Sequence, residues 1–277
     1  MSFINLRKMY RLFSQLLKPA KTVEFSDSCA SCALPCIAEA HRKIPEYLAD
    51  KISQETMVDS VKPYVAHILI NIGAQQAWGS DVNTEATISD LKLKFDASGT
   101  KVLITAYEGP HKMIVLPINK SVSNIADWDK FVNWVVSSQV DGASTDGFEL
   151  AETSYRHMIL VCTHSKRDKR CGVQGAILVD QFKSFQTNCF PVSHVGGHKF
   201  AGNVIVYHYP KLPAIQRQGE SNEGARAVQF VADWYGRVTS CHVASIVTET
   251  VEKGLVVKEL WRGRAGNGST GKTANDW

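Results

Sequence analysis

Short apolar runs bounded by polar segments dominate the second half of the chain. Residues 157–162 and 203–208 have the length and composition expected of buried strands. Between these two strands, apolar residues recur at helical spacing over residues 172–187. After the second strand, residues 222–234 are also expected to be helical. Residues 243–251 are apolar and β-branched, and the pattern leaves their type open. This order of elements, over about 110 residues, predicts a small α/β sandwich.

The first half of the chain predicts a smaller unit of mixed helices and strands. Residues 52–72 are expected to be broadly helical, and so are residues 124–136. Residues 102–107 and 113–116 are apolar runs of strand length, separated by a turn that contains glycine and proline. These elements predict an α+β domain.

A linker is expected at residues 141–147, which are rich in glycine, serine and aspartate. A length of 277 residues also favours two domains over one. We therefore expect an N-terminal α+β domain at residues 25–150 and a C-terminal α/β domain at residues 151–265. Residues 266–277 are polar and rich in glycine, and they are expected to form a flexible tail.

Both ends of the chain carry signals that bear on localisation. Residues 1–24 are basic and amphipathic, with no acid before Glu24, which is typical of a mitochondrial presequence. An ordinary amphipathic first helix is the alternative. At the other end, Asn275-Asp276-Trp277 resembles the tail by which some proteins dock on the cytosolic iron–sulfur targeting machinery, although Asn275 departs from the usual aliphatic residue. We expect a mitochondrial protein, with a cytosolic or dual localisation as the alternative.

Composition argues against several classes of function. The net charge of +4 is small and the basic residues are spread along the chain, so we expect no nucleic-acid binding. No apolar run approaches the roughly 18 residues of a membrane span. Residues 266–273 match the phosphate-binding pattern GxxxxGK[ST], but the strand and helix that must flank it are missing. We therefore expect no nucleotide binding.

The cysteines provide the first candidate chemistry. Cys162 ends a predicted strand and Cys171 opens a predicted helix, so one loop presents two thiols. A helix N-terminus and the basic residues of this loop stabilise thiolates, which bind soft metals. The alternative is a pair of structural or free cysteines beside a solvated loop. Cys189 and Cys241 are isolated and are expected in the core.

A pair of histidines forms the second feature, His194-Val-Gly-Gly-His198. The two glycines argue against a helix, and the glutamate of a zinc-protease motif is absent. A glycine turn instead lets both imidazoles face the same way. Two cysteines and two histidines in one small domain suggest a four-ligand metal site, and their spacing leaves zinc and [2Fe–2S] both open. Cys162-x-His164 imitates only one half of a Rieske motif.

Several segments together resemble the sucrase/ferredoxin-like family. They are residues 157–175, 192–207, 234–238 and 260–263, with the Cys-x8-Cys and His-x3-His spacings among them. The resemblance is strong over residues 151–265 and weaker over residues 25–150. It implies a thioredoxin-like ferredoxin fold for the C-terminal domain and a [2Fe–2S] cluster bound by Cys162, Cys171, His194 and His198.

The resulting functional prediction is a redox protein with a [2Fe–2S] cofactor, acting in electron transfer or redox sensing, within mitochondrial thiol redox control. Its partner would be another redox protein, and iron–sulfur assembly machinery is a further candidate. Two alternatives stay open. The closely spaced thiols Cys29, Cys32 and Cys36 suggest a thiol–disulfide oxidoreductase, and the four-ligand site could hold zinc in an interaction protein. We expect a non-enzymatic role rather than an enzyme.

Overall fold

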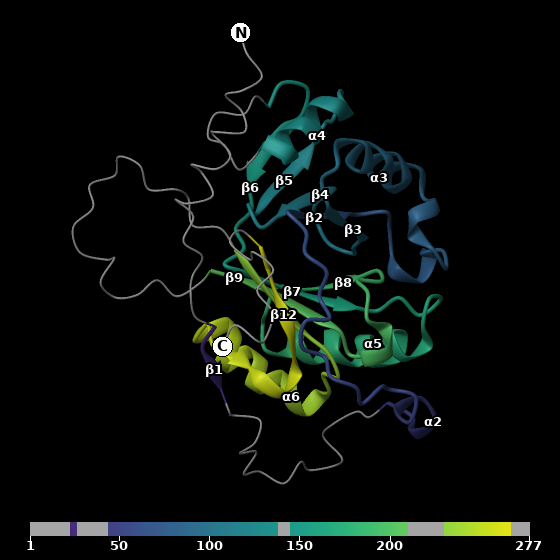
Figure 1. Ribbon diagram of the computed structural model, residues 1–277, viewed down its shortest axis with the longest axis vertical. Coiled ribbons are helices and arrows are strands. Elements are labelled where there is room, and N and C mark those ends of the chain that lie inside the picture. Colours follow the sequence, from purple (N-terminus) through teal and green to yellow (C-terminus); the bar gives the residue numbers. More distant parts are fainter. Residues whose placement is uncertain (1–22, 27–43, 138–144, 210–229, 267–277) are drawn as a thin grey trace, which may run out of the picture.

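The computed structural model describes residues 23–26, 44–137, 145–209 and 230–266. They form four layers, with a sheet from each half of the chain in the middle and helices on the two outer faces (Figure 1). Within these residues, no helix has the length and apolar character that a membrane crossing requires. The prediction of a mixed α/β protein is therefore confirmed, and the predicted divisions at residues 25–150 and 151–265 stay predictions.

The first sheet has the strand order β3-β2-β4-β5-β6. Its strands are β2 (Ala66–Ile70), β3 (Val102–Ala106), β4 (Met113–Leu116), β5 (Lys120–Ser123) and β6 (Glu149–Glu152). The parallel strands β2 and β3 are joined through α3 (Ala86–Ser98), and the other pairs are antiparallel. Together with α4 (Trp128–Ser137), α3 covers the outer face of this sheet.

The second sheet has the strand order β12-β10-β9-β7-β8. Its strands are β7 (His157–Cys162), β8 (Cys189–Val192), β9 (Val204–His208), β10 (Val231–Tyr235) and β12 (Trp261–Gly266). The parallel pair β7 and β8 is connected by α5 (Lys169–Ser184), and the other pairs are antiparallel. The outer face is covered by α5, α6 (Ser240–Ser245) and a π-helix (Ile246–Glu252).

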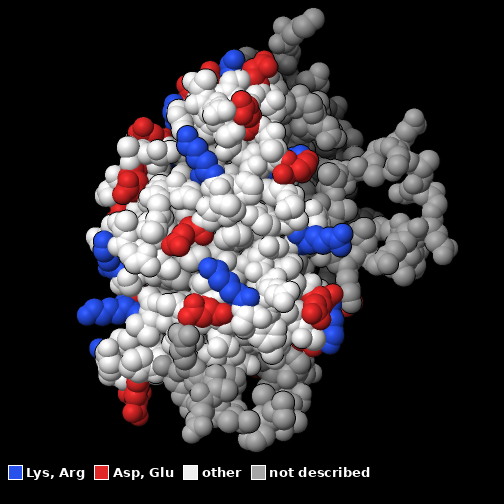
Figure 2. Space-filling view, turned by 180° about the vertical axis from the view of Figure 1, so that it is seen from behind, with Lys and Arg blue, Asp and Glu red and all other residues white. Residues whose placement is uncertain are grey.

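Short elements complete the described structure. They are β1 (Phe25–Ser26), which pairs in parallel with β11 (Val256–Val257), the helix α2 (Glu46–Ala49), and the 3-10 turns Gln75–Ala77, Val82–Thr84, His198–Phe200 and Lys258–Leu260. On the face opposite to that of Figure 1, basic and acidic side chains are interspersed (Figure 2). This face therefore lacks a large area of one charge sign among the residues drawn in colour.

Side-chain alternation along the strands creates the central core. Leu160 and Tyr207 point between the two sheets, whereas their neighbours Ile159 and Val206 point toward α5 and α6. All four side chains are fully buried. Burying one such apolar side chain stabilises the folded state by roughly 1.5–3 kcal/mol. Because alternate side chains of each strand are buried on opposite faces, packing on both faces stabilises the strand.

A buried chain of hydrogen bonds also joins the two sheets. His67 is bonded to Thr105 through Nε2 at 2.8 Å and to the Tyr207 hydroxyl through Nδ1 at 3.0 Å. That hydroxyl lies 2.9 Å from the Tyr64 hydroxyl, which accepts from the Trp234 indole at 3.1 Å. Burial lowers the pKa of His67 to about 3, so its imidazole is neutral at physiological pH.

Two predicted helices are wrong. Residues 52–72 contain turns followed by β2, because the run Ala66–Ile70 is buried on both faces and consists largely of strand-forming residues. The C-terminal end of the predicted helix at 222–234 belongs to β10, and its earlier part lies outside the described residues. The open segment 243–251 is helical.

The remaining expectations divide into confirmed elements and segments that the structure does not describe. The strands predicted at 102–107, 113–116, 157–162 and 203–208 are confirmed, and the helices at 124–136 and 172–187 correspond to α4 and α5. Residues 1–22 of the predicted presequence, residues 141–144 of the predicted linker and residues 267–277 of the predicted tail lie outside the described residues. The expectation that no strand precedes the phosphate-binding pattern at residues 266–273 is wrong, because β12 ends at Gly266. Cys29, Cys32 and Cys36 also lie outside them.

Candidate metal centre

The two predicted thiol ligands lie at the junction of β7 and α5. Cys162 ends β7, and Asp168 caps α5 by accepting a hydrogen bond from the Arg170 amide at 2.9 Å. Cys171 therefore lies in the first turn of α5. The helix approaches the strand end closely, because a Cβ added at Gly175 would lie only 2.2 Å from the Cys162 carbonyl oxygen. The predicted strand–loop–helix placement of the thiols is thus confirmed.

Both thiols are buried and lie within hydrogen-bonding reach of each other. This hydrogen bond lowers the pKa of Cys162 well below its usual range, and the nearby His194 acts in the same direction against the effect of burial. The same bond, together with burial, raises the pKa of Cys171. One thiolate is therefore readily formed at this place, which a metal site requires.

The histidine pair lies on the loop that follows β8. β7 and β8 are parallel, with Cys162 in register with Val192, so His194 follows β8 at the sheet edge where β7 ends in Cys162. Gly196 and Gly197 have φ of +92° and +69°, a left-handed backbone that suits glycine, and they turn the chain. His198 Nδ1 consequently lies 3.4 Å from His194 Nε2. The predicted glycine turn is confirmed.

The four predicted ligands thus form two adjacent pairs, and their chemistry fits the expected cofactor. Among the described residues, His194 Nδ1 is buried without a hydrogen-bond partner, as are the nearby His164 Nδ1 and Thr163 Oγ1, so the site has polar atoms left for a bound group. No group of three or more His, Cys, Asp or Glu side chains within the described ranges is arranged around a single ion. A [2Fe–2S] cluster with mixed ligands takes two on each iron, so it needs two pairs rather than one quartet.

Other predicted residues near this centre have different surroundings. The side chains of Lys166, Arg167 and Lys169 are exposed, so water screens their charges. The ring of His164 faces away toward the first half of the chain, where its Nε2 lies 2.6 Å from the Gly79 carbonyl oxygen. Sequence reasoning placed these residues near the cysteines but could not assign their contacts.

The isolated cysteines differ from each other. Cys189 is buried with a free thiol, as predicted for a core residue. Cys241 is disulfide-bonded and only partly buried, so the prediction of an isolated core cysteine is wrong. The spacing of single cysteines contains no information about which of them come together in the fold.

Two residues that sequence reasoning did not single out hold the histidine turn. Asn203 donates through Nδ2 to the Gly197 carbonyl at 3.0 Å and accepts from Arg262 Nη1 at 2.7 Å. Arg262 also donates to the Gly196 carbonyl at 3.3 Å and to Ser60 Oγ at 3.0 Å. Arg262 is only 1% exposed. In the sequence, Arg262 was marked only by its place in residues 260–263, one of the segments that resemble the family, and nothing there indicated its role.

A β-bulge directs Arg262 toward the centre. In the pairing of β10 with β12, Trp234 lies opposite Gly263 and Tyr235 lies opposite Trp261. Arg262 is therefore the extra residue of the bulge, without a cross-strand partner. Bulges of this kind re-aim a side chain, and here the guanidinium lies under the histidine turn.

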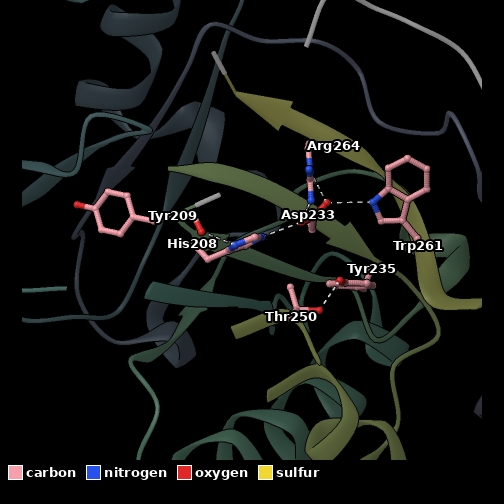
Figure 3. Close-up of polar contacts among 7 residues, drawn as sticks. All are labelled: His208, Tyr209, Asp233, Tyr235, Thr250, Trp261 and Arg264. Atoms are coloured by element: carbon pink, nitrogen blue, oxygen red, sulfur yellow. Dashed lines mark hydrogen bonds and ion pairs between the residues drawn. The ribbon is translucent and has the colours of Figure 1, made fainter. Parts of the chain in front are cut away.

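A second buried polar cluster lies further along the same strands. The Asp233 carboxylate accepts two hydrogen bonds from Arg264, at 2.9 and 2.7 Å, one from His208 at 2.8 Å and one from the Trp261 indole at 3.2 Å (Figure 3). Asp233 is fully buried. Its acceptor sites are filled by neighbouring side chains, which indicates a structural role.

A family model now matches this arrangement. The model, described as sucrase/ferredoxin-like, covers residues 57–263 and includes all four predicted ligands. The chain belongs to the sucrase/ferredoxin-like family. The resemblance inferred from the motifs is therefore confirmed. No solved structure matches the chain.

Several curated proteins are similar to part of the chain, and each is named "Altered inheritance of mitochondria protein 32". The protein from Debaryomyces hansenii is 42% identical over 114 residues, which are 39% of this chain and 36% of the relative. The proteins from Clavispora lusitaniae and Candida glabrata are 33% and 30% identical, over 40% and 46% of this chain and 36% and 38% of their own lengths. The chain thus spans little more than a third of these relatives.

Proposed function

We propose that this sucrase/ferredoxin-like protein binds a [2Fe–2S] cluster and functions as a one-electron redox protein. Cys162 and Cys171 would bind one iron, and His194 and His198 the other. The observation that carries the proposal is the meeting of a buried thiol pair and an imidazole pair where β7 and β8 end. When bound, the cluster supplies a centre that accepts and releases one electron.

The topology of the second sheet supports a thioredoxin-like ferredoxin domain. Its strands β8-β7-β9-β10 combine one parallel pair, connected by α5, with two antiparallel pairs. α6 follows β10 and packs beside α5 on the same face. This order is typical of thioredoxin-like folds, in which the first strand–helix junction presents the reactive thiols.

The protein's own residues prepare the site for metal. The hydrogen bond from Cys171 favours a thiolate at Cys162, and Asn203 and Arg262 fix the turn that carries the imidazoles. Because imidazole ligands are neutral, the cluster carries less negative charge than one with four thiolates, which raises its reduction potential. This arrangement supports the proposed role in electron transfer or redox sensing.

We further propose a mitochondrial role in thiol redox control. The printed name of the relatives, which refers to inheritance of mitochondria, supports the mitochondrial part of this proposal alone. Imaging the full chain with a C-terminal fluorescent protein tests this placement. Signal confined to the cytosol would contradict it.

The test of the cluster is anaerobic purification of the full chain, with iron, sulfide and zinc analysis and EPR of the dithionite-reduced protein. We expect two irons and two sulfides per chain. Cys162→Ser and Cys171→Ser should lose the cluster, because each removes one ligand. Cys189→Ser is the matched control, since it removes a buried thiol that belongs to the core between β8 and the outer helices.

Two outcomes would contradict the proposal. One zinc per chain without iron would favour a zinc-stabilised interaction protein. Full iron occupancy in Cys162→Ser would show that the thiols are not ligands, whatever the wild-type protein contains.

A further inference from the structure

Arg262 is a buried cation whose hydrogen-bond acceptors are all uncharged. Its guanidinium donates to the Ser60 hydroxyl, to the amide oxygen of Asn203 and to the carbonyls of Ser60 and Gly196. None of the ion pairs shown for the described residues includes it. Burying a charge without an anion bonded directly to it is expensive, so the folded protein carries an electrostatic cost here.

The guanidinium lies against the turn that carries the two candidate imidazole ligands, because it donates to the Gly196 carbonyl and packs against Gly197. Burial lowers the pKa of Arg262 to about 10, while Cys162 and Cys171 act in the opposite direction. The guanidinium therefore remains charged at neutral pH, and it faces the candidate site from the side of the histidine turn.

The position of this charge is fixed by contacts on several sides. The guanidinium lies over the Trp234 ring at 5.5 Å and near the Phe200 ring at 5.6 Å. A Cβ added at Gly197 would lie 2.3 Å from Arg262 Nη2, so only glycine allows the turn to lie against it. Aromatic walls exclude water, which leaves the charge poorly screened.

We propose that Arg262 is the built-in counter-charge of the reduced cluster and the residue that positions the histidine turn. This inference rests on the proposed function. With two thiolates, two sulfides and two neutral imidazoles on two ferric ions, the oxidised cluster is neutral overall. One electron from a reductant such as dithionite, or from an electrode, converts one iron to the ferrous state and leaves one negative charge. A fixed cation beside the site stabilises that reduced state and raises the reduction potential.

The test compares Arg262→Gln and Arg262→Lys with the control Arg237→Gln in the full-length protein. Arg237 also lies near the Phe200 ring, at 5.4 Å, but it is only partly buried and donates to the Ser53 carbonyl. The measurements are the midpoint potential by protein-film voltammetry and the iron content of each sample.

We expect Arg262→Gln to weaken electron affinity at least tenfold, which is about 59 mV for one electron. Arg262→Lys keeps the charge and should retain most of the potential, and Arg237→Gln should change it much less than Arg262→Gln. Because the charge is buried, the difference between wild type and Arg262→Gln should persist from low to high salt. A merely structural role would not produce this charge-dependent pattern.

The failures are distinguishable. Wild-type protein without iron overturns the proposed function, and this inference with it. A cluster-loaded Arg262→Gln with the wild-type potential, or with a difference that disappears at high salt, overturns this inference alone. If Arg262→Gln does not fold, Arg262→Met replaces it in the test, because its neutral side chain packs well against the rings of Trp234 and Phe200. We expect the same decrease in reduction potential from Arg262→Met as from Arg262→Gln.

Discussion

Two arginines of the same strand, Arg262 and Arg264, are buried in opposite electrostatic situations. Arg264 donates twice to the fully buried carboxylate of Asp233 (Figure 3). Within the described residues, Arg262 donates only to uncharged oxygens, and it lies against the turn between the candidate ligands His194 and His198. Among the described residues, Arg264 is therefore bonded directly to an anion, whereas Arg262 is bonded only to neutral groups.

This difference assigns a structural role to Arg264 and a functional role at the candidate site to Arg262, although both belong to one strand. A buried ion pair whose acceptor sites are filled needs nothing further, and it holds β10 against β12. A buried cation without a directly bonded anion can instead have its charge offset by a negatively charged group that binds nearby. The bulge at Arg262 accounts for the divergence, because it turns one guanidinium toward the histidine turn of the candidate site and leaves that of Arg264 directed at Asp233.

The largest effect is expected when the compensated pair is broken. Asp233→Asn removes the carboxylate and leaves Arg264 buried without its counter-charge, which should cost about 3–5 kcal/mol of unfolding free energy. Urea denaturation monitored by circular dichroism measures the change. Asp129→Asn is the control, since its ion pair with Lys94 is exposed and should change stability little. Equal effects of the two substitutions would show that Asp233 is not the stabilising partner.

The same carboxylate predicts how stability depends on pH. Burial opposes ionisation of Asp233, but Arg264 and His208 hold its pKa below the usual range. In the pH range between the folded and unfolded pKa values the unfolded chain binds more protons, so this contribution is present above about pH 4 and is lost as the pH falls further. The slope is at most about 1.4 kcal/mol per pH unit. Asp233→Asn should flatten this part of the profile, and an unchanged profile would contradict the assignment.

Local sequence patterns predicted the parts of the site that depend on neighbouring residues. The strand ending at Cys162, the helix opening near Cys171 and the glycine turn between His194 and His198 are each set by a few consecutive residues. Capping, burial and backbone freedom act over that range, so the four candidate ligands could be named. Their roles as ligands stay predictions.

The residues that sequence reasoning missed act across long separations. Arg262 lies 59 positions from Asn203 and 202 positions from Ser60, its hydrogen-bond partners. A bulge and a sheet pairing create these contacts, and the pattern of apolar and polar residues along the sequence does not predict them. The wrong helix at 52–72 has a related cause, because burial between two layers made β2 a strand in spite of helical spacing.

A smaller effect is expected from crowding the uncompensated arginine. Gly196→Ala and Gly197→Ala both place a side chain on left-handed backbone, which costs of order 1–3 kcal/mol. Only Gly197→Ala also collides with the Arg262 guanidinium, because nothing lies within 4 Å of a Cβ at Gly196. Gly197→Ala should therefore lower thermal stability and iron retention more than Gly196→Ala. Matching losses in the two variants would show that the turn does not need the arginine.

The smallest effect, and the sharpest, comes from giving Arg262 the anion that Arg264 already has. Asn203→Asp places a carboxylate where Asn203 Oδ1 accepts from Arg262 Nη1 at 2.7 Å. The new pair resembles that of Arg264 and Asp233, so the field that Arg262 exerts on the cluster should weaken. We expect a reduction potential lower by up to about 59 mV, a tenfold change for one electron. Asn203→Ser is the control, since it removes the same amide, and with it the Nδ2 bond to the Gly197 carbonyl, without adding charge. If Asn203→Asp and Asn203→Ser have the same potential while both bind the cluster, the charge of Arg262 does not tune the site, and the contrast between the two arginines is one of packing alone.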